Sequence, residues 1–140
     1  MKLTLTRNSN LNYWLWSTLK VNDNLSFDGL EMGDTNQIPV GLYKLEIVNH
    51  PQNGNKYITI INSLDEVCGY FTKRYTADFN RITMRIFRND ICIGKKKNET
   101  TMENLEGAYY QLLNAIENEI SHDKQVSMIV ENTIPLQPNP

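Results

Sequence analysis

The sequence predicts an α+β domain that consists mainly of antiparallel β-sheet, in a sandwich-like arrangement, with one long amphipathic helix near the C-terminus. Short segments of alternating apolar and polar residues follow one another between residues 2 and 94, separated by Gly, Pro, Asn and Asp. This two-residue period is typical of half-buried strands. After residue 98 the apolar residues recur every three or four positions, as in a helix that packs on one side. Many strands followed by one helix and a final strand indicate a single α+β domain.

The N-terminal strands are expected to form a hairpin that contains both tryptophans. KLTLTR at residues 2–7 alternates strictly, and NYWLWSTLKV continues in the same extended style before it reaches Asn22–Asn24 and LSF. The short polar run Asn22–Asn24 predicts a tight hairpin turn. Trp14 and Trp16 are two residues apart in one strand, so they are expected on the same face.

A second hairpin is expected after Pro39 and Gly41. GLYKLEIVN alternates, PQNGN supplies turn residues, and KYITIIN provides the returning strand. Between residues 63 and 80 the pattern is weaker: CGYFTKRY is predicted to be a strand and TADFN a loop. RITMRIF and ICIG are rich in isoleucine and aromatic residues and are expected to be extended again.

The C-terminal part is expected to contain the helix, the last strand and an arm. Thr100 followed by Glu103 fits a capping box, and the helix is expected over residues 102–121, with Leu105, Tyr109, Leu112, Ile116 and Ile120 on its apolar face. QVSMIV then predicts a strand. Residues 1–130 thus form one domain, while residues 131–140 contain three of the five prolines and are expected to be an extended arm. Pro135 and Pro138 in this arm are candidate contacts with a partner.

Composition and charge exclude several classes of protein. The net charge of −2 gives no basic field for a nucleic-acid backbone, so a nucleic-acid partner is not expected. Two cysteines separated by 24 positions match no zinc pattern; no metal and no cofactor are expected, and both thiols are expected to be reduced. The alternating N-terminus predicts no signal peptide and no membrane span. We therefore expect the cytoplasm of the producing cell, unless a virion carries the protein out.

Cys92 and His50 are the candidate catalytic residues. A cysteine nucleophile reacts as the thiolate and needs a base close in space, and His50, at the end of a predicted strand, could be that base. The alternative is that Cys92 is a small apolar residue of a buried strand. His122 follows the predicted helix and is expected to interact with its C-terminal carbonyl groups.

Two further features allow a binding function or a structural one. Trp14 and Trp16 could form an aromatic platform for a glycan or a protein, or they could pack in the core. Lys95–Lys97 could bind an anionic group, but such a run is more typical of a solvated loop that guards a sheet edge.

Several segments resemble a family of small domains of unknown function that occurs in phages, prophages and Bacteroidetes genomes. The family has an IPxGxY motif, which Ile38, Pro39, Gly41 and Tyr43 match. Two later motifs, IRIHxGN and GCIxVG, precede a helix and a strand, in the order seen in this chain. The resemblance implies the fold of that family. The His and Cys of its later motifs are similar to the catalytic pair of L,D-transpeptidases, in which a cysteine attacks a peptidoglycan peptide.

This chain departs from the family at those two positions. MRIF places Phe87 where the histidine would stand. When Gly94 is aligned with the last glycine of GCIxVG, Asp90 takes the place of the cysteine and Cys92 takes the variable position. The resemblance therefore favours the fold of the family and argues against its chemistry.

Together these observations favour a non-catalytic structural or interaction protein of a phage or other mobile element, a component of a virion or injection machine. Its expected partners are other proteins in a larger assembly or further copies of the chain. One alternative is a cysteine-dependent, peptidoglycan-acting enzyme that uses Cys92 and His50. A second alternative is a module that binds glycan or protein through exposed aromatic residues.

Overall fold

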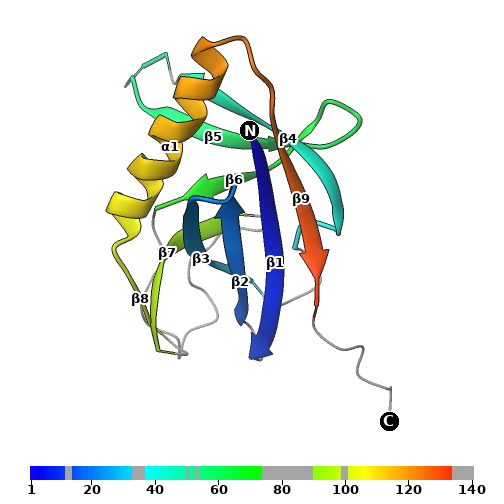
Figure 1. The fold of residues 1–140 in the computed structure, drawn as a ribbon, viewed down its shortest axis with the longest axis vertical. Coiled ribbons are helices and arrows are strands. Elements are labelled where there is room, and N and C mark those ends of the chain that lie inside the picture. Colours follow the sequence, from blue (N-terminus) through cyan, green and yellow to red (C-terminus); the bar gives the residue numbers. More distant parts are fainter. Residues whose placement is uncertain are drawn as a thin grey trace.

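The structure, a computed structural model, describes residues 1–11, 14–32, 37–49, 51–52, 54–73, 90–98 and 101–133. Within these ranges the chain forms nine strands and one helix (Figure 1). In chain order these are β1 (Lys2–Leu11), β2 (Trp14–Val21), β3 (Leu25–Met32), β4 (Gly41–Asn49), β5 (Lys56–Ile61), β6 (Val67–Thr72), β7 (Ile91–Asn98), β8 (Thr101–Glu103), α1 (Leu105–Ser121) and β9 (Val126–Asn132).

Eight of these strands close into a barrel. The order of pairing is β3-β2-β1-β9-β4-β5-β6-β7, and β7 pairs again with β3, while β8 extends the sheet beyond β7. Most neighbours are antiparallel, but β1 runs parallel to β9 and β6 runs parallel to β7. The β-rich α+β prediction is confirmed. The sandwich-like, antiparallel arrangement does not match, because alternation along a strand shows that one face is buried but not which strand pairs with it.

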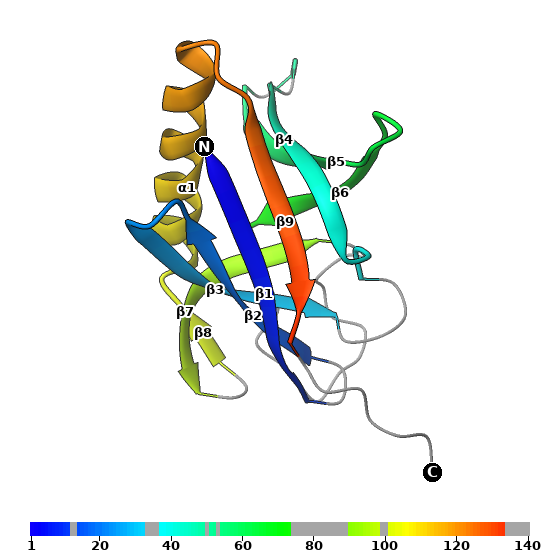
Figure 2. The same ribbon diagram turned by 45° about the vertical axis from the view of Figure 1, so that its right-hand side comes forward.

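The barrel interior is filled by side chains from every barrel strand. Inward residues alternate along each strand, such as Leu3 and Leu5 on β1 and Ile91 and Ile93 on β7, and all four are fully buried. The helix lies along the side of the barrel and packs mainly against β7 (Figure 2). It adds five buried residues, Ala108, Tyr109, Leu112, Leu113 and Ile116, to the same core.

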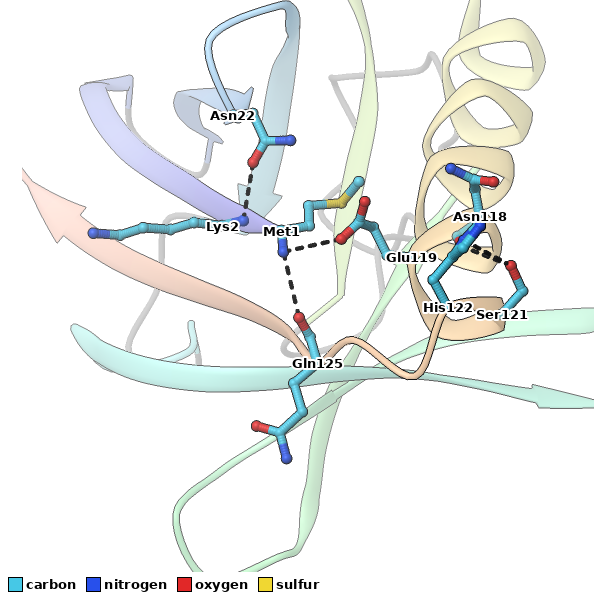
Figure 3. Close-up of polar contacts among 8 residues, drawn as sticks. All are labelled: Met1, Lys2, Asn22, Asn118, Glu119, Ser121, His122 and Gln125. Atoms are coloured by element: carbon cyan, nitrogen blue, oxygen red, sulfur yellow. Dashed lines mark hydrogen bonds and ion pairs between the residues drawn. The ribbon is translucent and has the colours of Figure 1, made fainter.

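Both expected hairpins are present. The β2–β3 turn comprises residues 22–24, and the side chain of Asn22 accepts a hydrogen bond of 3.1 Å from the backbone N–H of Lys2 (Figure 3). β4 and β5 pair antiparallel over six positions, from Lys44↔Ile61 to Asn49↔Lys56. β6 ends at Thr72, earlier than CGYFTKRY suggests. The segments TADFN and RITMRIF lie outside the described residues.

The helix begins later than expected, and the capping box is wrong. Thr101–Glu103 forms β8 and pairs with β7, and the helix begins at Leu105 after Asn104, which adopts a left-handed conformation and makes no side-chain cap. Consequently Lys95 and Lys96 lie in a paired strand and not in a loop. Gly94 allows this approach, because a Cβ there would lie 2.7 Å from the carbonyl oxygen of Glu103.

The C-terminal end of the helix agrees with the prediction for His122. Nδ1 of His122 lies 2.7 Å from the carbonyl oxygen of Asn118, in the last helical turn (Figure 3). Nearby, the N-terminal ammonium group of Met1 donates a hydrogen bond of 3.2 Å to Glu119. β9 then continues to Asn132, two residues beyond the expected end of the domain. Pro135 and Pro138 lie outside the described residues.

A buried ion pair crosses the barrel interior near the far end of β1. Arg7 donates two hydrogen bonds to the carboxylate of Glu31, at 3.1 Å from Nε and 2.8 Å from Nη2. Its Nη2 also donates to the carbonyl oxygen of Ile38 at 2.6 Å. Both side chains are almost fully buried. Burial raises the pKa of Glu31, because desolvation of its carboxylate outweighs the hydrogen bond and charge of Arg7.

We expect Glu31→Gln to lower the free energy of unfolding by about 3 to 5 kcal/mol, because it leaves the buried guanidinium of Arg7 without a counter-charge. Urea unfolding at neutral pH measures this loss. Glu46→Gln is the matched control: Glu46 pairs with Lys44 at 3.3 Å on the exposed surface, where such a pair is worth less than about 1 kcal/mol. Equal losses in the two variants would contradict a structural role for the buried pair.

Candidate functional site

Cys92 is a fully buried residue on the outer face of the barrel. Its neighbours Ile91 and Ile93 point into the main core, while Cys92 packs in a second cluster with Trp14, Trp16, Leu30 and Met102. Its exposed fraction is 0%, and burial raises the pKa of its thiol to about 12. Because a nucleophilic cysteine must form the thiolate, this environment suits a packing role and opposes the enzyme alternative.

The residues that align with the family motifs form no active site among the described residues. Asp90, at the position of the family cysteine, is partly buried, and desolvation raises its pKa to about 6, opposed by a hydrogen bond with the backbone of Tyr70. Gly94 serves the close contact with β8. Phe87 and His50 lie outside the described residues, so a pairing of His50 with Cys92 stays a hypothesis.

The IPxGxY segment has a structural role. Ile38 is buried and its carbonyl oxygen accepts the hydrogen bond from Arg7. The hydroxyl group of Tyr43 donates a hydrogen bond to the carbonyl oxygen of Pro39, which ties the start of the segment to β4. Gly41 has a φ of 157°. The motif thus holds the chain against the buried ion pair, and none of its side chains needs a ligand for this purpose.

Trp14 and Trp16 do not form an exposed platform. Their exposed fractions are 9% and 2%, and they pack against Leu30, Cys92 and Met102. Nζ of Lys96 lies 4.8 Å from the centroid of a Trp16 ring, a cation–π contact. The core-packing alternative therefore describes both indoles, and any exposed aromatic platform must consist of other residues.

An apolar face lies on the outside of β4 and β6. We define it by Leu42, Val48, Val67 and Tyr70, which are all exposed. β5 lies between these two strands and pairs with both, and Leu42 lies at one end of the face, beyond the last β4–β5 pair, Lys44↔Ile61. Lys44 and Glu46 interrupt it with an exposed ion pair of 3.3 Å. Grouped exposed apolar residues of this kind are typical of a protein interface.

A tyrosine–lysine groove lies beside this face, between the start of β5, the end of β6 and the helix. It has a volume of about 460 Å³ and is lined by Gly54, Asn55, Lys56, Tyr57, Phe71, Thr72, Lys73, Tyr109, Tyr110 and Leu113. Its volume lies in the range of small-molecule sites. Tyr57 and Tyr110 expose 36% and 46% of their surface, so aromatic surface is accessible on both sides of the groove.

The groove is built from fixed contacts. The hydroxyl group of Tyr109 donates to the carbonyl oxygen of Lys56 at 2.9 Å and joins the helix to β5, and its ring meets that of Tyr110 edge to face at 5.6 Å. Nζ of Lys73 lies 4.6 Å from the centroid of Tyr110 and donates to its hydroxyl group at 2.6 Å. The ammonium group of Lys56 is paired with Glu117 at 2.9 Å.

Sequence reasoning identified Tyr109 as part of the apolar helix face but missed Tyr57, Lys73 and Tyr110. Their segments are separated by up to 53 residues, the distance in sequence between Tyr109 and Lys56. No short motif signals that these segments meet. One signal was available in the sequence. Tyr109 and Tyr110 are adjacent, and neighbouring residues of a helix point in different directions, so they could not both lie on its apolar face.

Comparisons with known proteins add no further information on this site. No family model matches the chain, and neither a curated protein nor a solved structure matches it. The resemblance to the phage and prophage domain therefore stays a prediction. In the described part of the chain, no three His, Cys, Asp or Glu side chains are grouped so that they could bind a metal ion. Within the same ranges, no helix has the length and apolar character that crossing a membrane requires.

We expect Cys92 to be inert to a thiol reagent in the folded protein, because its sulfur is buried and its pKa is raised to about 12. Reaction with 5,5′-dithiobis(2-nitrobenzoic acid) in a Cys68→Ala background measures this rate, with the urea-unfolded variant as the fully reactive control. The partly exposed Cys68, measured in Cys92→Ala, should react faster. Labelling of Cys92 at the rate of a free cysteine would revive the enzyme hypothesis.

We expect the free energy of unfolding of Asp90→Asn, compared with that of the wild type, to be higher at about pH 7 than at about pH 4. The pKa of Asp90 is raised from 3.8 to about 6, so the folded state binds this proton more strongly than the unfolded chain. The free energy of unfolding of the wild type should therefore fall as the pH rises through this window, and the variant should lose that part of the fall. Urea midpoints at the two pH values test this, with exposed Asp23→Asn as control; an equal change in both variants would contradict it.

Proposed function

We propose that this protein is a non-catalytic interaction protein that binds another protein, or a further copy of itself, through the apolar face of β4 and β6. The observation that supports this most directly is the exposure of Leu42, Val48, Val67 and Tyr70 on adjacent parts of one sheet. Because the barrel closes, these strands already have their backbone partners. The face therefore offers side chains for docking and no free strand edge.

The state of Cys92 also favours this proposal over the peptidoglycan-acting enzyme. The thiol is buried in a cluster of large apolar side chains, and its raised pKa keeps it protonated at neutral pH. A transpeptidase-like reaction would require the sulfur to become exposed and deprotonated. The two rearrangements together would disrupt the second core cluster.

The biological setting is proposed from the resemblance alone. The IPxGxY segment and the order of the later elements are similar to the phage and prophage family, which suggests a phage or mobile element as the source. A structural component of a virion or injection machine is the form of this proposal that fits a chain without a favoured catalytic residue. The Pro-rich residues 134–140 follow β9 and stay candidates for an additional contact.

We expect Leu42→Ser to weaken partner binding by about tenfold or more, because it removes the most exposed apolar side chain of the proposed interface. The measurement is co-sedimentation of tagged protein with its native particle or complex, together with analytical ultracentrifugation of the purified chain for self-association. Ile120→Ser is the matched control, since Ile120 is an exposed apolar residue on the helix.

Both substitutions lie on the surface and should change the free energy of unfolding by no more than about 0.5 kcal/mol. Loss of association in Leu42→Ser but not in Ile120→Ser would support the face as the interface. A wild-type protein that sediments only as a free monomer in the native extract would overturn the proposal, as would equal binding by the two variants.

A further inference from the structure

The tyrosine–lysine groove has a distribution of charge that favours an anionic ligand. None of the ten described residues that line it is acidic. Among the described residues, Lys73 has no carboxylate within ion-pair distance, and its ammonium group donates a hydrogen bond to the hydroxyl group of Tyr110. An ammonium group has three donors, and this bond uses one of them. Lys56 differs, because its charge is neutralised by Glu117.

The shape and lining of the groove favour a sugar ring. Exposed tyrosine rings present flat apolar faces with a polar hydroxyl group at the edge, and the C–H face of a pyranose stacks on such a surface while its hydroxyl groups point away. The side chains of Asn55 and Thr72 add polar groups to the lining. A volume of about 460 Å³ is sufficient for one or two sugar rings.

The charged group of the ligand is better matched by a carboxylate than by a phosphate. Among the described lining residues, Lys73 is the one lysine without a carboxylate partner, and its compact charge suits a monoanion. Its described lining residues include no arginine for bidentate contact, and its helical residues begin at Tyr109, one turn beyond the helix N-terminus at Leu105. The described lining thus lacks the two features that most often bind phosphate groups, which are arginine forks and helix N-termini.

From these observations we propose that the tyrosine–lysine groove binds an acidic saccharide, with the sugar ring stacked on Tyr110 and the carboxylate bound by Lys73. The proposal is separate from the interface on β4 and β6, since Leu42, Val48, Val67 and Tyr70 do not line the groove. It also replaces Trp14 and Trp16 as the aromatic site, because those indoles are buried. No covalent step is involved.

The test is an NMR titration of the ¹⁵N-labelled full chain with D-glucuronate, D-glucose and adenosine monophosphate. Glucuronate should cause saturable shifts at residues 54–57, 71–73 and 109–113, with weaker binding of glucose at the same positions. Lys73→Met should weaken glucuronate binding by about tenfold, the effect of losing one charge-assisted hydrogen bond, and should leave glucose binding unchanged within about twofold.

Variants of Tyr110 separate stacking from charge. Tyr110→Leu should weaken the binding of both sugars, whereas Tyr110→Phe, which keeps the ring, should retain glucose binding. Lys20→Met is the charge-matched control, since Lys20 is exposed on β2 and does not line the groove. Four results would each overturn the proposal: no saturable shifts with glucuronate, shifts outside the groove, unchanged affinity in Lys73→Met, or tighter binding of adenosine monophosphate than of glucuronate.

Discussion

The pairing of β3 with β7 closes the sheet into a barrel. The positions of Cys92, the two tryptophans and the buried ion pair depend on this closure. Asp28, Gly29 and Leu30 pair with Gly94, Ile93 and Cys92, so two strands that are far apart in sequence become neighbours. Closure gives every residue of these strands an inner or an outer position. Ile91 and Ile93 then fill the barrel, while Cys92 joins the tryptophans outside it. The register between β3 and β7 therefore decides that the thiol of Cys92 is buried beside Leu30.

Closure also explains the buried ion pair and its surrounding segment. Arg7 and Glu31 both occupy inward positions, continuing the alternation of Leu3 and Leu5 on β1 and of Phe27 and Gly29 on β3. Each charge is deprived of water there, and each is compensated by the other. Ile38 supplies a further acceptor for the guanidinium. The IPxGxY segment thereby acquires a physical role, which is to supply an acceptor to the buried guanidinium group of Arg7.

The outer surface divides into regions with different chemistry. Cys92 of β7 and Met102 of β8 pack with the buried indoles, whereas β4 and β6 leave four apolar side chains exposed. The groove beside them combines exposed tyrosine rings with Lys73, which has no carboxylate partner among the described residues. The two regions adjoin, since Val48 of the apolar face pairs with Tyr57 of the groove.

The sequence by itself determined the strands of both hairpins, the turn at residues 22–24 and most of the helix, because periodicity and turn chemistry depend on local residues. Of the expected apolar helix face, Tyr109, Leu112 and Ile116 are buried, whereas Ile120 is exposed. Only the tertiary structure decided the closure of the barrel, the burial of Cys92 and the indoles, and the ion pair of Arg7 with Glu31. It also decided the start of the helix, since Thr101–Glu103 gains backbone partners on β7 that a local capping signal does not contain. The groove was beyond prediction for the same physical reason: its three walls meet through long-range strand pairing and helix packing, which no short segment encodes.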